Sequence, residues 1–248
     1  MIKYEINNEI AVLTLNRPEK RNALHPELVK QLKSKIKESA IDKTVKVLII
    51  TGEGKAFCAG ADLEYLSEMR NYSSLENEKD SRDLAEVYLL LYHFPKPVIA
   101  AVNGAAIAGG CGLASVCDFI VADDNAMFGY SEVKIGFIPA IVSIFLIRRI
   151  GEGLAKQLLV SGETIDAKRA YEIGFINHLY NNALAGALDV ASRIKNNSIL
   201  SMNLTKEMIH HISGFSVEDA VDYCLGLNTI SRTTEDFKEG LNNFLTKK

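Results

Sequence analysis

The chain has 248 residues, of which 48% are hydrophobic and 24% charged, and its formal net charge is −3. These values are typical of a globular protein with one large domain, or with a core and a smaller appendage. The small net charge gives no electrostatic basis for binding nucleic acid or anionic membranes, and no apolar run approaches the roughly 20 residues of a membrane span. The N-terminal residues lack the apolar core of an export signal, so we expect a cytoplasmic location.

The first part of the chain alternates between strands and a helix. Residues 4–6 and 10–15 are predicted to form a β-hairpin that turns at Asn7-Asn8. A loop, NRPEKRNALHP, then leads to an amphipathic helix over residues 26–40. Residues 45–50, VKVLII, have the continuous apolar pattern of a buried strand, which ends in the loop TGEGKAFCAGAD.

Helices and strands continue to alternate further along the chain. The polar stretch over residues 63–93 predicts helices, and the strand over residues 97–102 precedes a short glycine-rich helix. Strands are predicted again over residues 117–123 and 175–179, while from Ala140 onward the pattern is mostly helical. This alternation of strands with helices indicates an α/β core.

The four cysteines show neither a CxxC spacing nor another metal-ligand pattern. They are Cys58, Cys111, Cys117 and Cys224, and three of them lie in apolar surroundings. We therefore expect reduced structural thiols rather than disulfides or a metal site.

The glycine-rich helix begins in AIAGGCGLASVCD with Gly109, Gly110 and Gly112. The first four N–H groups of a helix lack an internal partner, and burying each of them unpaired costs about 1–3 kcal/mol. An acceptor is therefore expected beside these glycines, unless they serve only to let the helix pack tightly against its sheet.

Two nucleotide-binding patterns match this segment only in part. Gly104 and Gly109 have the spacing of a phosphate loop, but the Lys and Ser/Thr that should follow are replaced by Gly110 and Cys111. A dinucleotide fingerprint would require a third glycine where Ser115 stands. Both nucleotide-binding alternatives are therefore weak.

A second loop, AFCAGADL, also follows a buried strand and also leads through small residues into a predicted helix. Two such loops allow two backbones to approach one small group closely. Two N–H groups aimed at the same oxygen form an oxyanion hole, which stabilises a carbonyl oxygen whose negative charge grows during reaction. The missing acceptor is then a substrate carbonyl.

Four segments, in this order and spacing, resemble the crotonase superfamily of enoyl-CoA hydratases and isomerases: LNRPEKRNAL, GKAFCAGADL, KPVIAAVNGAAIAGGCGLASVCD and FGYSEVKIGFIPA. The resemblance covers residues 10–179 and extends weakly into the C-terminal helices. It implies an α/β fold built as a spiral of ββα repeats, with the acyl-CoA site in residues 1–195. It also implies a C-terminal helical trimerisation region in residues 196–248, and trimers that often pair into hexamers.

The resemblance further implies an acyl-CoA substrate whose thioester C=O lies between the N–H groups of Ala61 and Gly109. Coenzyme A is then part of the substrate, and neither a separate cofactor nor a metal is expected. Carried over position by position, CoA lies along residues of two loops, with Lys20 and Arg21 suited to its phosphates: Lys20, Arg21, Ala23, Ala59, Ala61, Asp62 and Leu63. Phe244 and Lys247 are expected to cap the nucleotide of a neighbouring subunit.

Many members of this family use two glutamates to hold a water molecule. The later position matches Glu132, whereas the earlier one falls on Gly112, which has no side chain to position water or move a proton. We therefore expect Glu132 to act as the general acid and base, with its pKa raised by burial. Apolar neighbours in sequence are expected to bury it: Phe128, Ile135, Phe137 and Ile138. The acyl pocket is expected to include Tyr130, Ser131, Gly112, Ile138 and Pro139.

One glutamate is compatible with more than one function. It can hydrate a 2-enoyl-CoA if another group or the substrate holds the water, or it can move a proton between the α and γ carbons, which is Δ3-Δ2 isomerisation. The Ser131-Glu132 pair resembles that of hydratases acting on branched, carboxylated substrates such as methylglutaconyl-CoA, and this favours hydration. The apolar segment FIPAIVSIFLIRRIGE, in place of a glycine-rich PGxGG, indicates a different acyl pocket. A non-catalytic acyl-CoA-binding protein is the further alternative, which the retained Glu132 disfavours.

Overall fold

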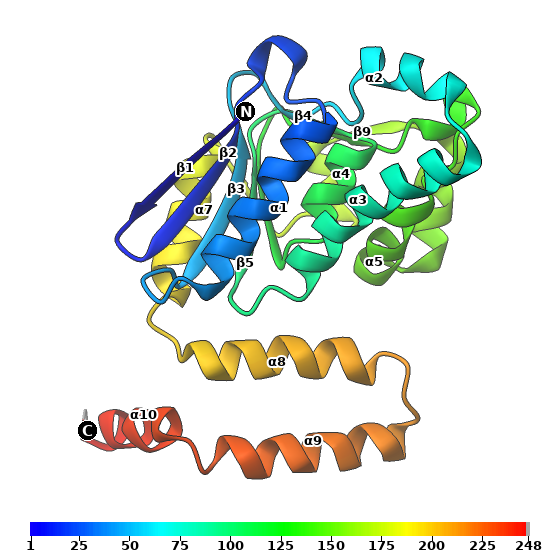
Figure 1. Cartoon of the computed structure of the whole chain (residues 1–248). Coiled ribbons are helices and arrows are strands. Elements are labelled where there is room, and N and C mark those ends of the chain that lie inside the picture. Colours follow the sequence, from blue (N-terminus) through cyan, green and yellow to red (C-terminus); the bar gives the residue numbers. More distant parts are fainter. Residues whose placement is uncertain (247–248) are drawn as a thin grey trace. The chain divides into compact units, whose positions relative to one another are not determined.

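The computed structural model describes residues 1–246, and Figure 1 shows their secondary structure. The chain divides into two compact units, Met1–Arg193 and Ile194–Lys248. The first unit contains both sheets, and the second is helical. No helix within the described residues has the length and apolar character needed to cross a membrane.

The larger sheet has six strands in the order β1-β2-β3-β5-β7-β10. These strands are β1 (Ile2–Asn7), β2 (Ile10–Leu15), β3 (Val47–Gly52), β5 (Val98–Val102), β7 (Phe119–Asp123) and β10 (His178–Tyr180). β1 pairs antiparallel with β2 through the predicted hairpin, and the other pairings are parallel. Every residue of β3 and β5 is buried, which agrees with their continuous apolar patterns, because a parallel sheet is usually covered on both faces.

A second sheet has four strands of three residues each, in the order β4-β6-β8-β9. They are β4 (Ala56–Cys58), β6 (Ala105–Ile107), β8 (Met127–Gly129) and β9 (Thr164–Asp166). β4, β6 and β8 follow β3, β5 and β7 in the chain, so each long strand is followed by a short one and then by helical structure. This repeated unit confirms the expected spiral of ββα repeats.

Seven helices of the first unit surround the sheets (Figure 1). They are α1 (Pro26–Ile41), α2 (Leu63–Glu68), α3 (Ser74–Tyr92), α4 (Gly109–Ser115), α5 (Ala140–Ser161), α6 (Ala167–Glu172) and α7 (Ala183–Ile194), with short 3-10 turns η1 (Pro18–Lys20), η2 (Met69–Asn71) and η3 (Glu132–Ile135). α3 begins with a capping box in which Ser73 and Glu76 satisfy each other's backbone N–H groups. α3 packs on α1 and α4 packs on α5. Gly151 interrupts α5 with φ 76° and ψ 164°, so the predicted run of helix contains a sharp break.

The predicted strand over residues 175–179 lies slightly later in the chain, at His178–Tyr180. Phe175 and Ile176 are buried beside the sheet instead of pairing within it. The Phe175 ring packs edge-on against Phe128, with 5.2 Å between the ring centroids. Core packing of these apolar side chains, rather than strand pairing, explains the apolar pattern at this point.

The second unit contains α8 (Ile199–Ile212), α9 (Val217–Ser231) and α10 (Glu235–Thr246). Ser198 and Ser216 cap the first two of these helices with side-chain hydrogen bonds. Tyr223 of α9 stacks on His211 of α8, with ring centroids 5.4 Å apart. None of the three helices has a fully buried residue, and apolar side chains such as Val217 and Leu225 are exposed.

Candidate active site

The two glycine-rich loops identified in the sequence lie against each other. β4 pairs in parallel with β6, with Ala56 opposite Ala105. A Cβ placed on Gly110 would lie 2.2 Å from the carbonyl oxygen of Cys58, and one on Gly60 would lie 2.9 Å from that of Ile107. Glycine at these two positions is therefore a steric requirement of the close approach between the loops.

The first loop presents the backbone N–H of Ala61 away from its neighbouring chain segment. Leu24 forms a parallel bridge with Ala61: the Leu24 N–H donates to Gly60 O (2.6 Å), and the Leu24 C=O accepts from the Asp62 N–H (3.0 Å). In such a bridge the middle residue directs its own N–H and C=O to the opposite side. Ala61 is also an exposed residue.

The second loop presents the backbone N–H of Gly109, the first residue of α4. This N–H has no acceptor within the helix, because it belongs to the first turn. Ala108, which precedes it, has φ 50° and ψ −123°, an arrangement that L-residues rarely adopt. Strain of about 1–3 kcal/mol is typical of such residues, and they cluster at functional sites.

Glu132 emerges beside the second loop. β8 pairs with β6 so that Gly129 lies opposite Ile107, and Ala108 N–H donates to Gly129 O at 2.7 Å. The chain segments that follow the two strands therefore leave the sheet at the same edge, one leading to Gly109 and the other to Glu132. This topology places the segments that carry Gly109 and Glu132 at the same end of the short strands.

The Glu132 carboxyl is buried, with the residue only 8% exposed. Its Oε2 atom has no hydrogen-bond partner among the described residues. Burial raises the pKa of Glu132 above its ordinary value, while its own backbone N–H opposes the shift. A carboxyl with a raised pKa and an unused oxygen is suited to accepting and returning a proton.

Gly112 is closed to any side chain. A Cβ at this position would lie 2.2 Å from Cγ1 of Val142 and 3.3 Å from the hydroxyl oxygen of Tyr88. Val142 is itself buried, in the first turns of α5. The position of the absent glutamate is therefore filled by an apolar side chain from another helix.

The expected CoA-binding residues of the loop NRPEKRNALHP differ in exposure. Arg21 is exposed, Ala23 is buried, and Lys20 forms an ion pair with Glu64 at 2.5 Å. The Arg21 backbone has φ 49°, and its carbonyl accepts a hydrogen bond from the Ala59 N–H at 3.0 Å. The loop NRPEKRNALHP is thus attached to the loop that carries Ala61 by backbone hydrogen bonds.

Asp62, another of these residues, forms a buried ion pair with Arg17 at 2.9 Å and caps α2 through the Glu64 N–H. Burial on its own would raise the pKa of Asp62, but the hydrogen bonds from Arg17 and from backbone N–H groups lower it below the ordinary value. Leu63, the next residue, is exposed. The Asp62 carboxylate therefore has a structural role: it connects the loop that carries Ala61 to Arg17 in the loop NRPEKRNALHP.

The expected acyl-pocket residues are not gathered in one enclosed space. Tyr130 is buried, Ser131 and Pro139 are half-buried, and Ile138 is exposed. Ile135 and Phe137 are also exposed, so in the isolated chain they do not bury Glu132 as expected, whereas Phe128 is in the core. Phe244 is exposed on the second unit, and Lys247 lies outside the described residues.

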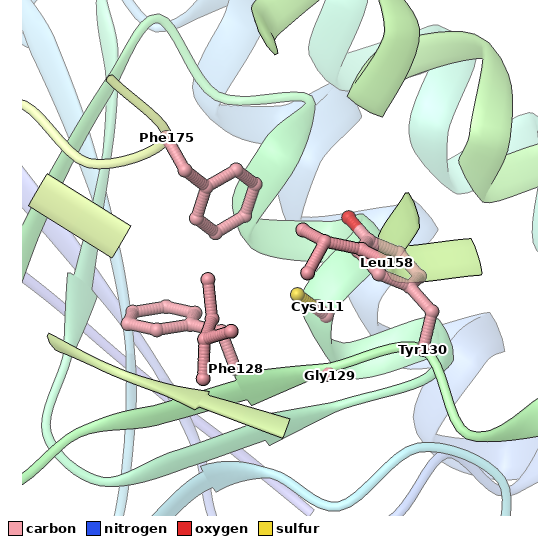
Figure 2. A pocket seen from close by; sticks show the side chains of 7 residues that line it. Cys111, Phe128, Gly129, Tyr130, Leu158 and Phe175 are labelled. Atoms are coloured by element: carbon pink, nitrogen blue, oxygen red, sulfur yellow. The ribbon is translucent and has the colours of Figure 1, made fainter. Parts of the chain in front are cut away.

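Figure 2 shows a small, mostly apolar pocket on the core side of α4. Phe128, Phe175 and Leu158 surround it, and Tyr130 and Cys111 also face it. Its lining does not include Glu132, Ala61 or Gly109. It is a region of core packing rather than the reaction site.

Three residues that sequence reasoning did not assign to the site contribute to its geometry: Tyr88, Ala108 and Val142. The Tyr88 hydroxyl donates to the carbonyl of Gly109 at 2.9 Å. The helical spacing of Tyr88 marks it as a core residue, which it is, and no signal in one sequence shows that its hydroxyl reaches α4. Among the described residues, no group of three or more His, Cys, Asp or Glu side chains could hold a metal ion.

Comparisons with known proteins agree with this fold. The family model described as enoyl-CoA hydratase/isomerase matches residues 5–248. A crotonyl-CoA hydratase of Syntrophomonas wolfei is 36% identical over 100% of this chain and 95% of its own length, and a 2,3-dehydroadipyl-CoA hydratase of Escherichia coli is 35% identical over 96% and 93%. The crystal structure of an enoyl-CoA hydratase from Polaromonas superposes with a TM-score of 0.95 at 32% identity, covering 100% of this chain and 97% of that one. The chain therefore belongs to the enoyl-CoA hydratase/isomerase family of the crotonase superfamily.

Proposed function

We propose that the protein is an enoyl-CoA hydratase, which adds water across the double bond of a 2-enoyl-CoA thioester. The observation that carries this proposal is the buried Glu132 carboxyl, whose Oε2 has no partner among the described residues. It lies on the chain segment that leaves the sheet beside Gly109. A group that only supported the fold would be expected to have its buried oxygen satisfied.

The oxyanion hole in this proposal consists of the backbone N–H groups of Ala61 and Gly109. The contact between their loops and the outward direction of the Ala61 N–H support it. The two donors stabilise the negative charge that develops on the thioester oxygen as water adds to the β-carbon. Removing one such donor typically lowers the rate by about 10²–10³-fold.

Glu132 moves the proton. Its carboxylate takes a proton from the attacking water while a C–O bond forms at the β-carbon, and the α-carbon receives a proton from the same carboxyl. The raised pKa of Glu132 brings the carboxyl closer to the working pH, where it can exchange protons in both directions. The products are a 3-hydroxyacyl-CoA and the regenerated carboxylate.

In this proposal coenzyme A lies along the loop NRPEKRNALHP and the loop AFCAGADL, which carries Ala61. Lys20 and Arg21 are basic and lie where they can meet its phosphates, once Lys20 leaves its exposed partner Glu64. Backbone groups of Ala23, Ala59 and Leu63 are suited to the adenine. The proposal also includes a cytoplasmic location, no cofactor other than the CoA of the substrate, no metal, and assembly into trimers or hexamers in which Phe244 and Lys247 reach a neighbour's nucleotide.

The names of two relatives favour hydration over the alternatives, since one is a crotonyl-CoA hydratase and the other a 2,3-dehydroadipyl-CoA hydratase. A branched, carboxylated substrate similar to methylglutaconyl-CoA remains our candidate for the acyl group. Δ3-Δ2 isomerisation is the second candidate, because Gly112 leaves a single glutamate and isomerisation requires only one proton carrier. A non-catalytic acyl-CoA-binding protein would have no use for a buried, unsatisfied carboxyl.

One assay separates these functions. The purified protein is mixed in turn with crotonyl-CoA, 3-methylglutaconyl-CoA and a 3-enoyl-CoA, and the absorbance of the conjugated thioester is followed. Hydration predicts loss of absorbance with one or both of the first two substrates. A gain with the 3-enoyl-CoA alone would indicate an isomerase, and no change with any substrate would support the binding protein.

A further inference from the structure

A single glutamate leaves the attacking water incompletely held. The water must direct a lone pair at the β-carbon while one of its protons faces Glu132, and a second acceptor for its other proton fixes that orientation. Reactions of this kind depend on such positioning, and a displacement of about 1 Å can lower the rate about 10²-fold. Because Val142 closes the space at Gly112, the second acceptor must come from elsewhere.

The hydroxyl of Tyr88 is a polar group beside this closed space. Its oxygen lies 3.3 Å from the ideal Cβ position of Gly112 and 3.2 Å from that of Gly109. The Tyr88 ring comes from α3 and is fully buried, with its centroid 5.8 Å from that of Phe145. The hydroxyl is thus held between the oxyanion glycine and the position of the absent glutamate.

The hydrogen-bonding state of this hydroxyl suits the role of an acceptor. Its proton is donated to the Gly109 carbonyl at 2.9 Å, which leaves the lone pairs of the oxygen to accept. Burial, followed by the charges of Cys58, Glu132 and Cys111, raises the pKa of Tyr88 well above its ordinary value. The group therefore stays a neutral phenol.

Two other hydroxyls near α4 are less well placed. Ser115 donates to the carbonyl of Gly112 at 2.9 Å, within its own helix. Tyr130 faces the apolar pocket of Figure 2, whose lining does not include Glu132. Tyr88 is thus the better candidate.

We propose that the hydroxyl oxygen of Tyr88 holds the attacking water together with Glu132, in the role that a second carboxylate would fill. This inference rests on the proposed hydratase function. The water donates one hydrogen bond to Oε2 of Glu132 and the other to the Tyr88 oxygen, and its own oxygen bonds to the β-carbon as the π bond breaks. The O–H bond facing Glu132 breaks, that carboxyl supplies the proton to the α-carbon, and Tyr88 keeps its own proton throughout.

The test compares two reactions in Tyr88→Phe. The first is hydration of the substrate found for the wild-type protein. The second is exchange of the α-protons of butyryl-CoA in D₂O, which uses Glu132 and the oxyanion hole but adds no water. We expect the hydration kcat of Tyr88→Phe to fall about 10²-fold, as for a misplaced reactant, while exchange stays at the wild-type rate.

Tyr92→Phe is the matched control. Tyr92 lies one turn further along α3, with its ring 5.7 Å from the same Phe145 ring, and the control variant should keep both rates. An equal fall of hydration and exchange in Tyr88→Phe would show that the hydroxyl only supports Gly109, and would overturn the proposal, as would unchanged hydration. If Tyr88→Phe does not fold, 3-fluorotyrosine at position 88, which weakens the oxygen as an acceptor, must lower hydration and spare exchange.

The proposed function is tested separately by the wild-type protein alone. A wild-type protein that hydrates no enoyl-CoA would overturn the proposed function, and with it the role of Tyr88. A wild-type protein that hydrates its substrate, combined with a fully active Tyr88→Phe, would overturn only the role of Tyr88.

Discussion

Val142 packs directly over Gly112, so that a Cβ on the glycine would lie 2.2 Å from Cγ1 of the valine. Gly112 belongs to α4 and Val142 to α5; these helices pack against each other, and the two residues are 30 positions apart in the chain. The glycine at position 112 and the valine at position 142 are thus coupled, because the valine side chain occupies the space that a side chain at position 112 would need. A carboxylate side chain at position 112 would therefore require a smaller residue at position 142 as well.

Gly112→Glu is therefore expected to destabilise the fold by more than about 3 kcal/mol, because it combines overpacking with a buried charge. Gly112→Glu together with Val142→Gly should recover part of this loss, since the second change removes the clash. The measurement is urea unfolding of both variants. Gly153→Glu is the control, because Gly153 has open space around it and the substitution should change stability by less than about 1 kcal/mol. Equal destabilisation in the single and double variants would contradict the coupling.

Ala108→Gly should relieve backbone strain at the entrance to α4. The conformation of Ala108, φ 50° and ψ −123°, costs an L-residue about 1–3 kcal/mol, whereas glycine adds about 0.4–1 kcal/mol of unfolded-chain entropy. We expect the variant to be as stable as the wild-type protein or up to about 2 kcal/mol more stable. Ala114→Gly in the same helix is the control, and should cost about 1 kcal/mol or more. Thermal unfolding that ranks Ala108→Gly below the control would refute the strain.

Asp62→Ala should separate the two CoA-binding loops. The variant leaves the Arg17 guanidinium buried without its carboxylate partner and removes the cap of α2. Breaking a buried ion pair from one side typically costs about 3–5 kcal/mol. We expect a loss of this size in urea unfolding, together with a higher KM for the acyl-CoA. A variant with wild-type stability would contradict the structural role of this pair.

The pH dependence of the Asp62 contribution has a defined sign. Because the folded-state pKa of Asp62 is lowered, its stabilising contribution is present above the unfolded pKa and is lost as the pH falls through the folded one. The stability difference between the wild-type protein and Asp62→Ala should therefore shrink on acidification.

The long strands and helices of the core could be predicted from the sequence because their patterns are local. β3 and β5 are continuous apolar runs, and α1 is amphipathic behind the helix-initiating Pro26. The strands of the second sheet could not be predicted from local sequence patterns, since each has only three residues. Those strands exist because the neighbouring long strands bring them together.

The candidate site was predictable where backbone geometry dominates. Gly60 and Gly110 are needed for a close approach of two loops, and this is the feature that small residues in both loops suggested. The Val142 contact and the Tyr88 hydrogen bond depend on tertiary packing between distant helices, which no spacing in one sequence reports. The exposure of Ile138, expected in the acyl pocket, likewise depends on what surrounds the loop rather than on its apolar character.

The raised pKa of Glu132 predicts that pH affects the contribution of Glu132 to stability in the opposite direction to that of Asp62. A carboxyl with a raised folded-state pKa contributes stability below its unfolded pKa, and this contribution is lost as the pH rises through the folded value. Glu132→Gln should therefore gain stability relative to the wild-type protein as the pH rises above the ordinary glutamate value of 4.5. Urea unfolding of both proteins across this range checks the sign, and a constant difference would contradict the pKa shift.

The proposed mechanism assigns the proton transfer in enoyl-CoA hydration to Glu132. It is tested most directly by the kcat of Glu132→Gln on the substrate that the wild-type protein hydrates, with binding of butyryl-CoA measured by calorimetry as the control. We expect kcat to fall about 10²–10⁴-fold, as for loss of a general acid and base, while butyryl-CoA binds as it does to the wild-type protein. Hydration at the wild-type rate by Glu132→Gln would contradict it.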